Sequence, residues 1–491
     1  MRRPRPIAAA LLCLGLLALP SPAAAIWSPE GESYALDIGG SLRSIGAGMQ
    51  NYDFPLLFGE DNSADGLSQT LLRLTFTGEL WSFYSYEAHV VQGFNFTTSA
   101  FSALGAVGGR GAMRYRALDF AWDWADAGDY TASLGFDRLN MKLALPYVDI
   151  TAGRQAINFS KTYFWNPLDV FLPFDPQSFD RDYKPGVDAL KVDIAIGDYT
   201  SITLVAAAGR RIGYKLSEIG NWAVPYTPDW PRNPDTGCIM PRPEDFESVS
   251  TDLFIQQIQD DPWYGSALML RAATNLWEWD FSLQGGKVYG GYHLGFGFSG
   301  ELFTLGLRGE VAYFFADDDD KDNTARIFDP REVTMFREVD LVRDHAKVVV
   351  GIGRSFESSL DLQLEYFYNG SGGDDLDAGL LRLGLGETQS LSEHLLGATV
   401  SYELHPLVRG SLAFIFSASD MSSMLSPTIV YSIADEAEFV AGAMLAFGPR
   451  PRAHLFKLDV FGDCVDIPFA KLHSEFGTYP NIYFGEFKFY F

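Results

Sequence analysis

The stretch Leu360-Asp-Leu-Gln-Leu-Glu-Tyr-Phe-Tyr368 alternates apolar and polar side chains along most of its length. Successive side chains of a β-strand point to opposite sides, so this pattern predicts a strand with one apolar face and one polar face. Residues 72–80 and 303–316 show the same alternation, with charged residues such as Arg73 and Arg308 at the polar positions. The pattern indicates a wall that separates an apolar environment from a watery interior.

Outward from these segments, the alternation predicts 18 strands, and one missed or additional hairpin would make the number 16 or 20. Short and long connections follow each other, as in barrels with tight turns on one side of a membrane and long loops on the other. The sequence therefore predicts an all-β chain, folded as a transmembrane antiparallel up-and-down β-barrel. The predicted strands cover residues 33–45, 67–80, 83–96, 131–145, 148–158, 186–196, 199–209, 265–275, 279–291, 292–300, 303–316, 346–356, 359–369, 393–404, 407–417, 424–433, 436–447 and 478–491.

The composition agrees with such a barrel. The chain has 491 residues, of which 47% are hydrophobic and 14% aromatic, and it contains 48 glycines. Beyond the N-terminal segment, no stretch is long and apolar enough for a spanning helix. The formal net charge of −26 argues against nucleic acid as a partner. Length alone would suggest several soluble domains, but a barrel grows by adding strands and stays one domain.

The N-terminal segment has the three parts of a secretory signal peptide: arginines at positions 2, 3 and 5, an apolar run over residues 7–19, and Ala23-Ala24-Ala25. We expect cleavage after Ala25, so residues 1–25 form the signal peptide and residues 26–491 the barrel. A membrane-anchoring helix is the alternative, but a span needs about 20 apolar residues. Cys238 and Cys464 then remain in a compartment where a disulfide can persist. The sequence leaves open whether they pair.

The C-terminal stretch Asn481-Ile-Tyr-Phe-Gly-Glu-Phe-Lys-Phe-Tyr-Phe491 resembles the closing strand of bacterial outer-membrane barrels. In that class of proteins the terminal aromatic strand is read by the barrel assembly machinery, so Phe491 implies this machinery as a partner. A soluble sandwich that ended on an exposed aromatic face would risk aggregation. We therefore expect a Gram-negative outer-membrane location, with outer-membrane lipid and lipopolysaccharide around the barrel.

The residues Gly153-Arg154-Gln155 end a predicted strand and precede a long loop. This arrangement, with the general layout of the chain, resembles the superfamily of alginate-export-like and related bacterial porins. The resemblance implies an 18-stranded barrel that conducts polar solutes or polysaccharide. Alternation would place Arg154 on the lipid-facing side. Either Gly153 marks a bulge that reverses the facing, or the arginine lies at headgroup level.

The loop at residues 159–185 is rich in aromatic residues and interrupted by prolines. It is too apolar to extend into water, so we predict that it folds back into the barrel mouth and narrows it. A compact external cap or a subunit contact is the alternative. The candidate constriction residues are Phe164, Trp165, Asn166, Asp169, Arg181, Asp182 and Lys184.

Charged residues at the polar strand positions are candidates for the pore lining, with basic residues somewhat ahead of acidic ones. A basic ladder would favour anionic solutes, whereas cross-strand ion pairs would only stiffen the wall. The candidates are Arg43, Arg73, Glu79, Glu87, Arg138, Lys142, Lys191, Asp193, Arg271, Arg308, Glu310, Glu365 and Arg409.

We find no pattern in the sequence for a catalytic site, a metal site or a cofactor. The seven histidines have no metal-ligand spacing, and the glycines between residues 285 and 300 form no phosphate loop and more simply permit close packing. We predict a channel for polar solutes, with anions among them, or for polysaccharide. The alternatives are a structural or partner-binding barrel, and a hydrolase at the barrel rim. Solute, direction of transport and oligomeric state are not determined by the sequence.

Overall fold

The computed structural model describes residues 27–31, 33–54, 63–98, 114–171, 183–214, 234, 238, 256–259, 262–317, 324–328, 336–340, 342–373, 375–460 and 463–491. The predicted signal peptide lies outside these residues. The main sheet has 20 strands, of which β1 (Glu30–Gly31) and β5 (Ala121–Asp126) are additions to a ring of 18. The ring consists of β2 (Tyr34–Gln50), β3 (Ala64–Leu80), β4 (Tyr84–Thr97), β6 (Tyr130–Ala144), β7 (Val148–Gln155), β8 (Val187–Ile196), β9 (Thr200–Ala207), β12 (Ala267–Leu276), β13 (Trp279–Val288), β14 (Gly291–Leu302), β15 (Leu305–Ala316), β18 (His345–Ser355), β19 (Asp361–Asn369), β20 (His394–His405), β21 (Val408–Ser417), β22 (Ser423–Ala434), β23 (Ala437–Phe447) and β26 (Asn481–Tyr490).

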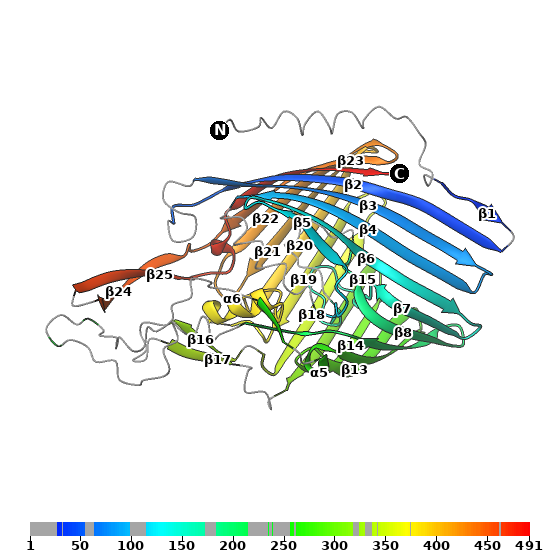
Figure 1. Cartoon of the computed structure of the whole chain (residues 1–491), viewed down its shortest axis with the longest axis horizontal. Helices are drawn as coiled ribbons and strands as arrows, with labels where there is room; N and C mark the ends of the chain where they lie inside the picture. The colour runs from blue at the N-terminus through cyan, green and yellow to red at the C-terminus, as the bar shows by residue number, and fades with distance from the viewer. Residues whose placement is uncertain are drawn as a thin grey trace.

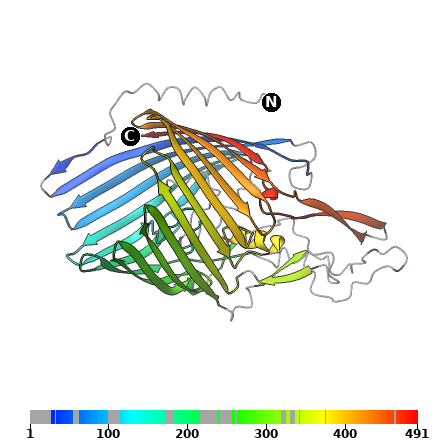
Figure 2. The same ribbon diagram turned by 180° about the vertical axis from the view of Figure 1, so that it is seen from behind.

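All neighbouring strands of the ring pair antiparallel, and the last strand closes it against the first. Strand β26 pairs with β23 on one side and with β2 on the other, from Ser41 opposite Tyr490 to Gln50 opposite Asn481. Figures 1 and 2 show the resulting barrel of strongly tilted strands from its two sides. The predicted fold, an up-and-down barrel of 18 strands, is therefore confirmed, and each predicted strand overlaps an observed one.

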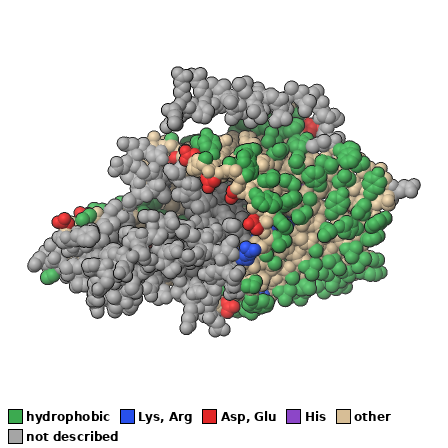
Figure 3. All heavy atoms as spheres, viewed as in Figure 1, with side chains coloured by type: hydrophobic (Ala, Val, Ile, Leu, Met, Phe, Trp, Pro, Cys, Tyr) green, Lys and Arg blue, Asp and Glu red, His purple; other side chains and the backbone are tan. Residues whose placement is uncertain are grey.

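The outer side of the barrel is apolar. On three successive strands, Leu283, Phe296 and Val311 lie side by side in the register and are all exposed. Their sequence neighbours Gln284 and Glu310 face the other way and are buried. Figure 3 shows hydrophobic side chains over the barrel wall on the viewed side. A closed sheet with an apolar exterior leaves no unpaired edge in lipid, so this protein is a barrel of the Gram-negative outer membrane.

The two ends of the barrel differ. One end carries tight turns such as Trp81-Ser82 and Trp277-Glu278, where both residues have positive φ, and we assign it to the periplasm. The other end carries the long connections, which contain elements that alternation did not predict. These are β10 (Arg211–Tyr214), β11 (Gln256–Gln259), α5 (Pro262–Gly265), β16 (Thr324–Phe328), β17 (Phe336–Asp340), α6 (Leu376–Leu385), β24 (Arg452–Val460), β25 (Asp463–Lys471) and η4 (Phe476–Thr478). Within the described residues, no helix is both long and apolar enough to cross a bilayer.

Two clusters of buried apolar residues lie inside the barrel. One joins inward residues of β8, β9, β12 and β13 to Tyr115, Ile157, Phe159 and Phe171. The other joins inward residues of β2, β18–β23 and β26 to Phe164, Trp165 and Phe476. Strands β3, β4 and β6 contribute no buried member to either cluster. Leu67 of β3 packs against the second cluster, but the other inward residues of these three strands are mainly polar. The interior is therefore apolar along much of the ring and mainly polar beside β3, β4 and β6.

Candidate functional site in the barrel lumen

The chain leaves the wall at the motif Gly153-Arg154-Gln155. Gly153 has a φ of +116°, which disfavours a side chain, and a Cβ there would lie 3.0 Å from Cα of Asn140. Arg154 is buried and donates to both carboxylate oxygens of Asp188, at 2.7 and 3.0 Å. It also donates to the carbonyl oxygens of Phe136 and Leu118. At the end of β7, the guanidinium thus links β6, β8 and the segment before β5. We call this junction the seam.

Of the two positions expected for Arg154, the structure excludes the bulge. Strand β7 pairs with β6 and β8 without a shift in register at Gly153. The guanidinium is 3% exposed, because Asp188 and two backbone carbonyl oxygens enclose it. Alternation could not reveal this position, because the partners of Arg154 come from segments distant in sequence.

After Gln155, residues 156–171 enter the barrel; we call this segment, which includes residues 159–171 of the predicted loop and three residues predicted as strand, the aromatic loop. Two inward carboxylates hold its backbone. Glu310 on β15 accepts hydrogen bonds from the backbone N–H groups of Lys161, at 2.7 Å, and Leu168, at 3.1 Å. Glu365 on β19 accepts from the N–H groups of Tyr163 and Phe164 at 2.6 and 2.7 Å. Hydrogen bonds to a carboxylate are stronger than neutral ones, so the two glutamates fix the loop to the inner wall.

Glycines of the wall provide space for the apolar side chains of the aromatic loop. A Cβ on Gly297 would lie 2.7 Å from Leu168, and a Cβ on Gly397 would lie 2.7 Å from the ring of Phe164. Gln284 also donates to the carbonyl oxygen of Leu168 at 2.7 Å. The glycine-rich run between residues 285 and 300 therefore permits close packing, as its sequence predicts.

The structure places five of the seven candidate constriction residues. Phe164 and Trp165 are buried, and Trp165 stacks on Phe367 of β19 with 5.2 Å between ring centroids. Asn166 accepts a hydrogen bond from Ser160 within the loop at 2.8 Å. Asp169 and Lys184 form a buried ion pair with each other. Arg181 and Asp182 lie outside the described residues.

All thirteen candidate pore-lining residues lie at inward positions of the ring, opposite in parity to the exposed apolar side chains. Several of them form ion pairs on the wall. Lys142 contacts Asp149 at 2.7 Å and Lys191 contacts Asp193 at 2.8 Å. Arg308 also pairs with Glu365 at 2.8 Å, and Arg43 with Glu486 at 2.9 Å. Much of the basic series is thus neutralised locally, which leaves less excess positive charge than the sequence suggests.

Positive charge remains in excess beside β3, β4 and β6, where three arginines surround Asp137. Arg73 and Arg116 contact its carboxylate at 2.8 and 3.0 Å, and Nε of Arg138 lies 4.0 Å away. We call Arg73, Arg116, Arg138 and Asp137 the arginine cluster. The nearby Glu87, which accepts from Asn140 at 2.9 Å, is a second carboxylate on this side. With Glu87 included, the group still carries one more positive charge than negative charges.

The sequence prediction missed two members of the arginine cluster. The register between β4 and β6 shifts between His89 and Val90, where Asp137 is the additional residue of β6. This bulge turns the consecutive residues Asp137 and Arg138 to the same side, which alternation excludes. Arg116 lies between strands, where no periodic signal exists.

A second inward segment, residues 472–479, was also missed. Phe476 is fully buried and belongs to the same cluster as Phe164 and Trp165. The adjacent Glu475 carboxylate accepts from the backbone N–H of Ser392 at 2.9 Å and from the hydroxyl of Ser390. Burial raises the pKa of the Glu475 carboxyl above its usual value. A single phenylalanine in a polar loop carried no signal for this placement.

Comparisons with known proteins agree with the barrel architecture only. No protein-family model and no curated protein sequence matches the chain. Among solved structures, OccD3 (OpdP) of Pseudomonas aeruginosa is similar with 10% identity and a TM-score of 0.45, covering 96% of this chain and 93% of that protein. OccAB4 of Acinetobacter baumannii has 8% identity and a TM-score of 0.49, with 94% and 98% covered.

A mutant of Rh. blastica porin has 8% identity and a TM-score of 0.38, with 93% of this chain and 100% of the porin covered. At such identities the similarity concerns the fold alone. The function therefore has to be inferred from the chain's own lumen.

Proposed function

We propose that this protein is an outer-membrane channel for small polar solutes, with a preference for anions. The observation that carries the proposal is the unequal lining of the lumen. The aromatic loop packs on the apolar strands, whereas β3, β4 and β6 present mainly polar inward residues beside the arginine cluster. Solutes then pass between the loop and these three strands.

The lining of this side suits hydrated solutes. Gln69 donates to Asn95 at 2.8 Å on the inner wall, so amides continue the polar face along β3 and β4. Arg116 is the most accessible arginine of the cluster, with 28% of its side chain exposed. A guanidinium binds carboxylate and phosphate groups through two parallel hydrogen bonds, which a simple point charge cannot do. Together with Glu87, the cluster has one arginine more than it has carboxylates, and it lies where the aromatic loop narrows the lumen. This positive charge would raise the local concentration of anions.

The occupied interior favours small solutes over a polymer. Loop residues from Ile157 to Phe171 fill space beside most strands of the ring, together with Phe476. A polysaccharide chain would need a continuous wide lumen, whereas a small solute needs only the polar side.

Ion permeation through the purified protein in a planar bilayer tests the proposal. We expect conductance, with a reversal potential of the sign that anion preference gives in a salt gradient. Arg116→Gln removes an accessible charge and should move the reversal potential towards cations. Arg354→Gln is the matched control, because Arg354 lies at an exposed position near the periplasmic end and contacts Phe356.

A folded barrel without conductance would refute the channel and favour a structural role. Conductance with an unchanged reversal potential in Arg116→Gln would refute the assignment of selectivity to the arginine cluster.

A further inference from the structure

His89 on β4 lies at an inward position directly beside the arginine cluster. In the register it is opposite Thr75 of β3 on one side and opposite Arg138 of β6 on the other. The residue is 9% exposed. Histidine is the side chain whose charge ordinarily changes between about pH 5 and pH 8. The charged side of the lumen therefore contains one group whose charge depends on pH in this range.

The contacts of His89 determine where a further proton can bind. Its Nε2 lies 3.2 Å from Oε1 of Glu87, and because a carboxylate only accepts, the neutral ring carries its hydrogen on Nε2. Its Nδ1 is buried and has no hydrogen-bond partner among the residues that the structure describes. A proton can thus bind at Nδ1 while the contact with Glu87 is kept. The side chain of Glu87 is 32% exposed, so it connects the ring to the water of the lumen.

The charged groups around the ring of His89 act in both directions. Burial, Arg73 on β3 and Arg138 on β6 favour the neutral imidazole. Glu87 on the same strand and Asp137 on β6 favour the imidazolium. Because these influences oppose each other, both protonation states of the ring are accessible.

We infer that His89 makes the anion preference of the channel depend on pH; this inference rests on the proposed channel function. With a neutral ring, the three arginines of the cluster face two carboxylates, Asp137 and Glu87, so one positive charge is in excess. Protonation of His89 raises this excess to two. Anions then concentrate more strongly beside the cluster in acid than at neutral pH.

The pH dependence of ion selectivity tests this inference. The reversal potential of the purified full chain is measured in a planar bilayer with a salt gradient, from about pH 8 down to about pH 5. We expect the ratio of anion to cation permeability to rise by about twofold, because the excess charge doubles. His89→Gln removes the titrating ring, keeps a polar side chain and should abolish this rise. His405→Gln is the matched control, since His405 is exposed at the periplasmic end of β20 and should leave the rise intact.

Glu87→Gln distinguishes titration of His89 from a merely structural role. The substitution removes the carboxylate beside Nε2, so the imidazolium loses its nearest favourable charge. The midpoint of the rise in anion preference should therefore move to lower pH. At about pH 8 the variant should prefer anions more than the wild type does, because it has lost one negative charge. A midpoint that stays in place would contradict the role of His89.

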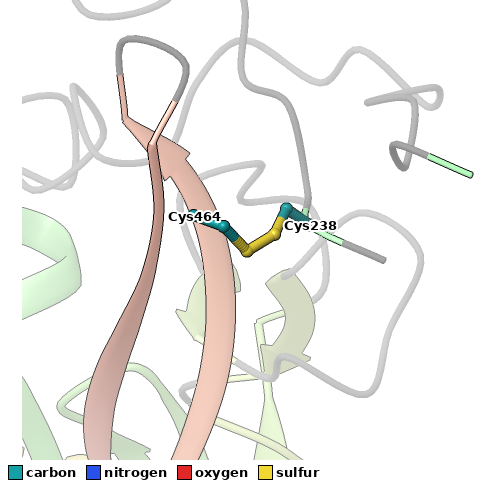
Figure 4. The surroundings of a disulfide bond; sticks show 2 residues. All are labelled: Cys238 and Cys464. Atoms are coloured by element: carbon teal, nitrogen blue, oxygen red, sulfur yellow. A yellow bond between two sulfur atoms is a disulfide. The ribbon is translucent and has the colours of Figure 1, made fainter. Parts of the chain in front are cut away.

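A fixed charge at position 89 provides an independent test. Cys238 and Cys464 are joined in a disulfide with their Cα atoms 6.0 Å apart (Figure 4), and the third cysteine, Cys13, belongs to the predicted signal peptide. His89→Cys therefore introduces a single free thiol into the mature barrel. A methanethiosulfonate reagent joins its thiolate in a mixed disulfide and releases methanesulfinate. A reagent that carries an ammonium group should raise the anion preference at neutral pH, whereas one that carries a sulfonate group should lower it.

Heat-modifiable electrophoretic mobility verifies that each variant barrel is folded. Anion preference that stays constant with pH, or that rises equally in His89→Gln, would overturn the role of His89 while leaving the channel in place. Absence of conductance, or of anion preference at every pH, would refute the proposed function and this inference with it.

Discussion

The inner wall of this barrel has two sides that differ in kind. From β18 through β26 to β2, inward residues such as Val349 and Leu395 pack with Phe164, Trp165 and Phe476. Beside β3, β4 and β6, the inward residues are mainly polar and lie next to the arginine cluster. The same alternation of side chains builds both sides. A loop that folds into the lumen thus converts one side of the wall into a core and leaves the other side as the surface available to solutes.

Detaching the aromatic loop should have the largest effect on the difference between the two sides of the inner wall. Glu310→Gln combined with Glu365→Gln replaces two carboxylates that accept four backbone N–H groups, each bond contributing about 1.5–3 kcal/mol. Each amide keeps one acceptor oxygen and places an NH2 group against a donor. We expect the loop to leave the wall and single-channel conductance to rise severalfold.

Glu301→Gln is the control for the detached loop, since Glu301 is exposed at the periplasmic end of β14. Unchanged conductance in a correctly folded double variant would show that the carboxylates do not hold the loop.

The next largest effect is expected from breaking the contacts of Arg154 at the seam. Arg154→Ala leaves Asp188 buried without its guanidinium and removes donors from two carbonyl groups. Breaking such a buried pair costs about 3–5 kcal/mol, which urea-induced unfolding from lipid vesicles would measure. Arg154→Lys should recover only part of this loss, because an ammonium lacks the planar fork. A free energy of unfolding equal to that of the wild type would mean that the seam is held by other contacts.

A smaller effect is expected from adding one methyl group where the aromatic loop packs on the apolar side of the wall. Gly397→Ala places a Cβ 2.7 Å from Phe164, and such overpacking costs about 1–3 kcal/mol. Gly46→Ala meets nothing within 4 Å and serves as the matched control on β2. We expect Gly397→Ala to lower the free energy of unfolding and Gly46→Ala to leave it almost unchanged. Equal effects would argue against a close fit of the loop to this wall.

The strands were predictable because lipid and water impose a strict alternation on every membrane-spanning segment. This rule holds at Leu360–Tyr368 as well as in the terminal strand, and it gave the number of strands. The hairpin β24–β25 was not predicted, because an extracellular hairpin has no lipid-facing side that would require alternation. Asp137 escaped it because a bulge adds one residue and reverses the facing of those beyond it.

The sequence by itself determined the closed barrel, its approximate size and the inward charges, since these follow from a period of two residues. It also pointed to the aromatic loop, because so apolar a segment has to be covered. Only the tertiary structure decided which inward charges are neutralised, where Arg154 lies, that Phe476 enters the lumen, and that Cys238 pairs with Cys464. Each of these depends on contacts between residues far apart in the chain, and local periodicity carries no information about such contacts.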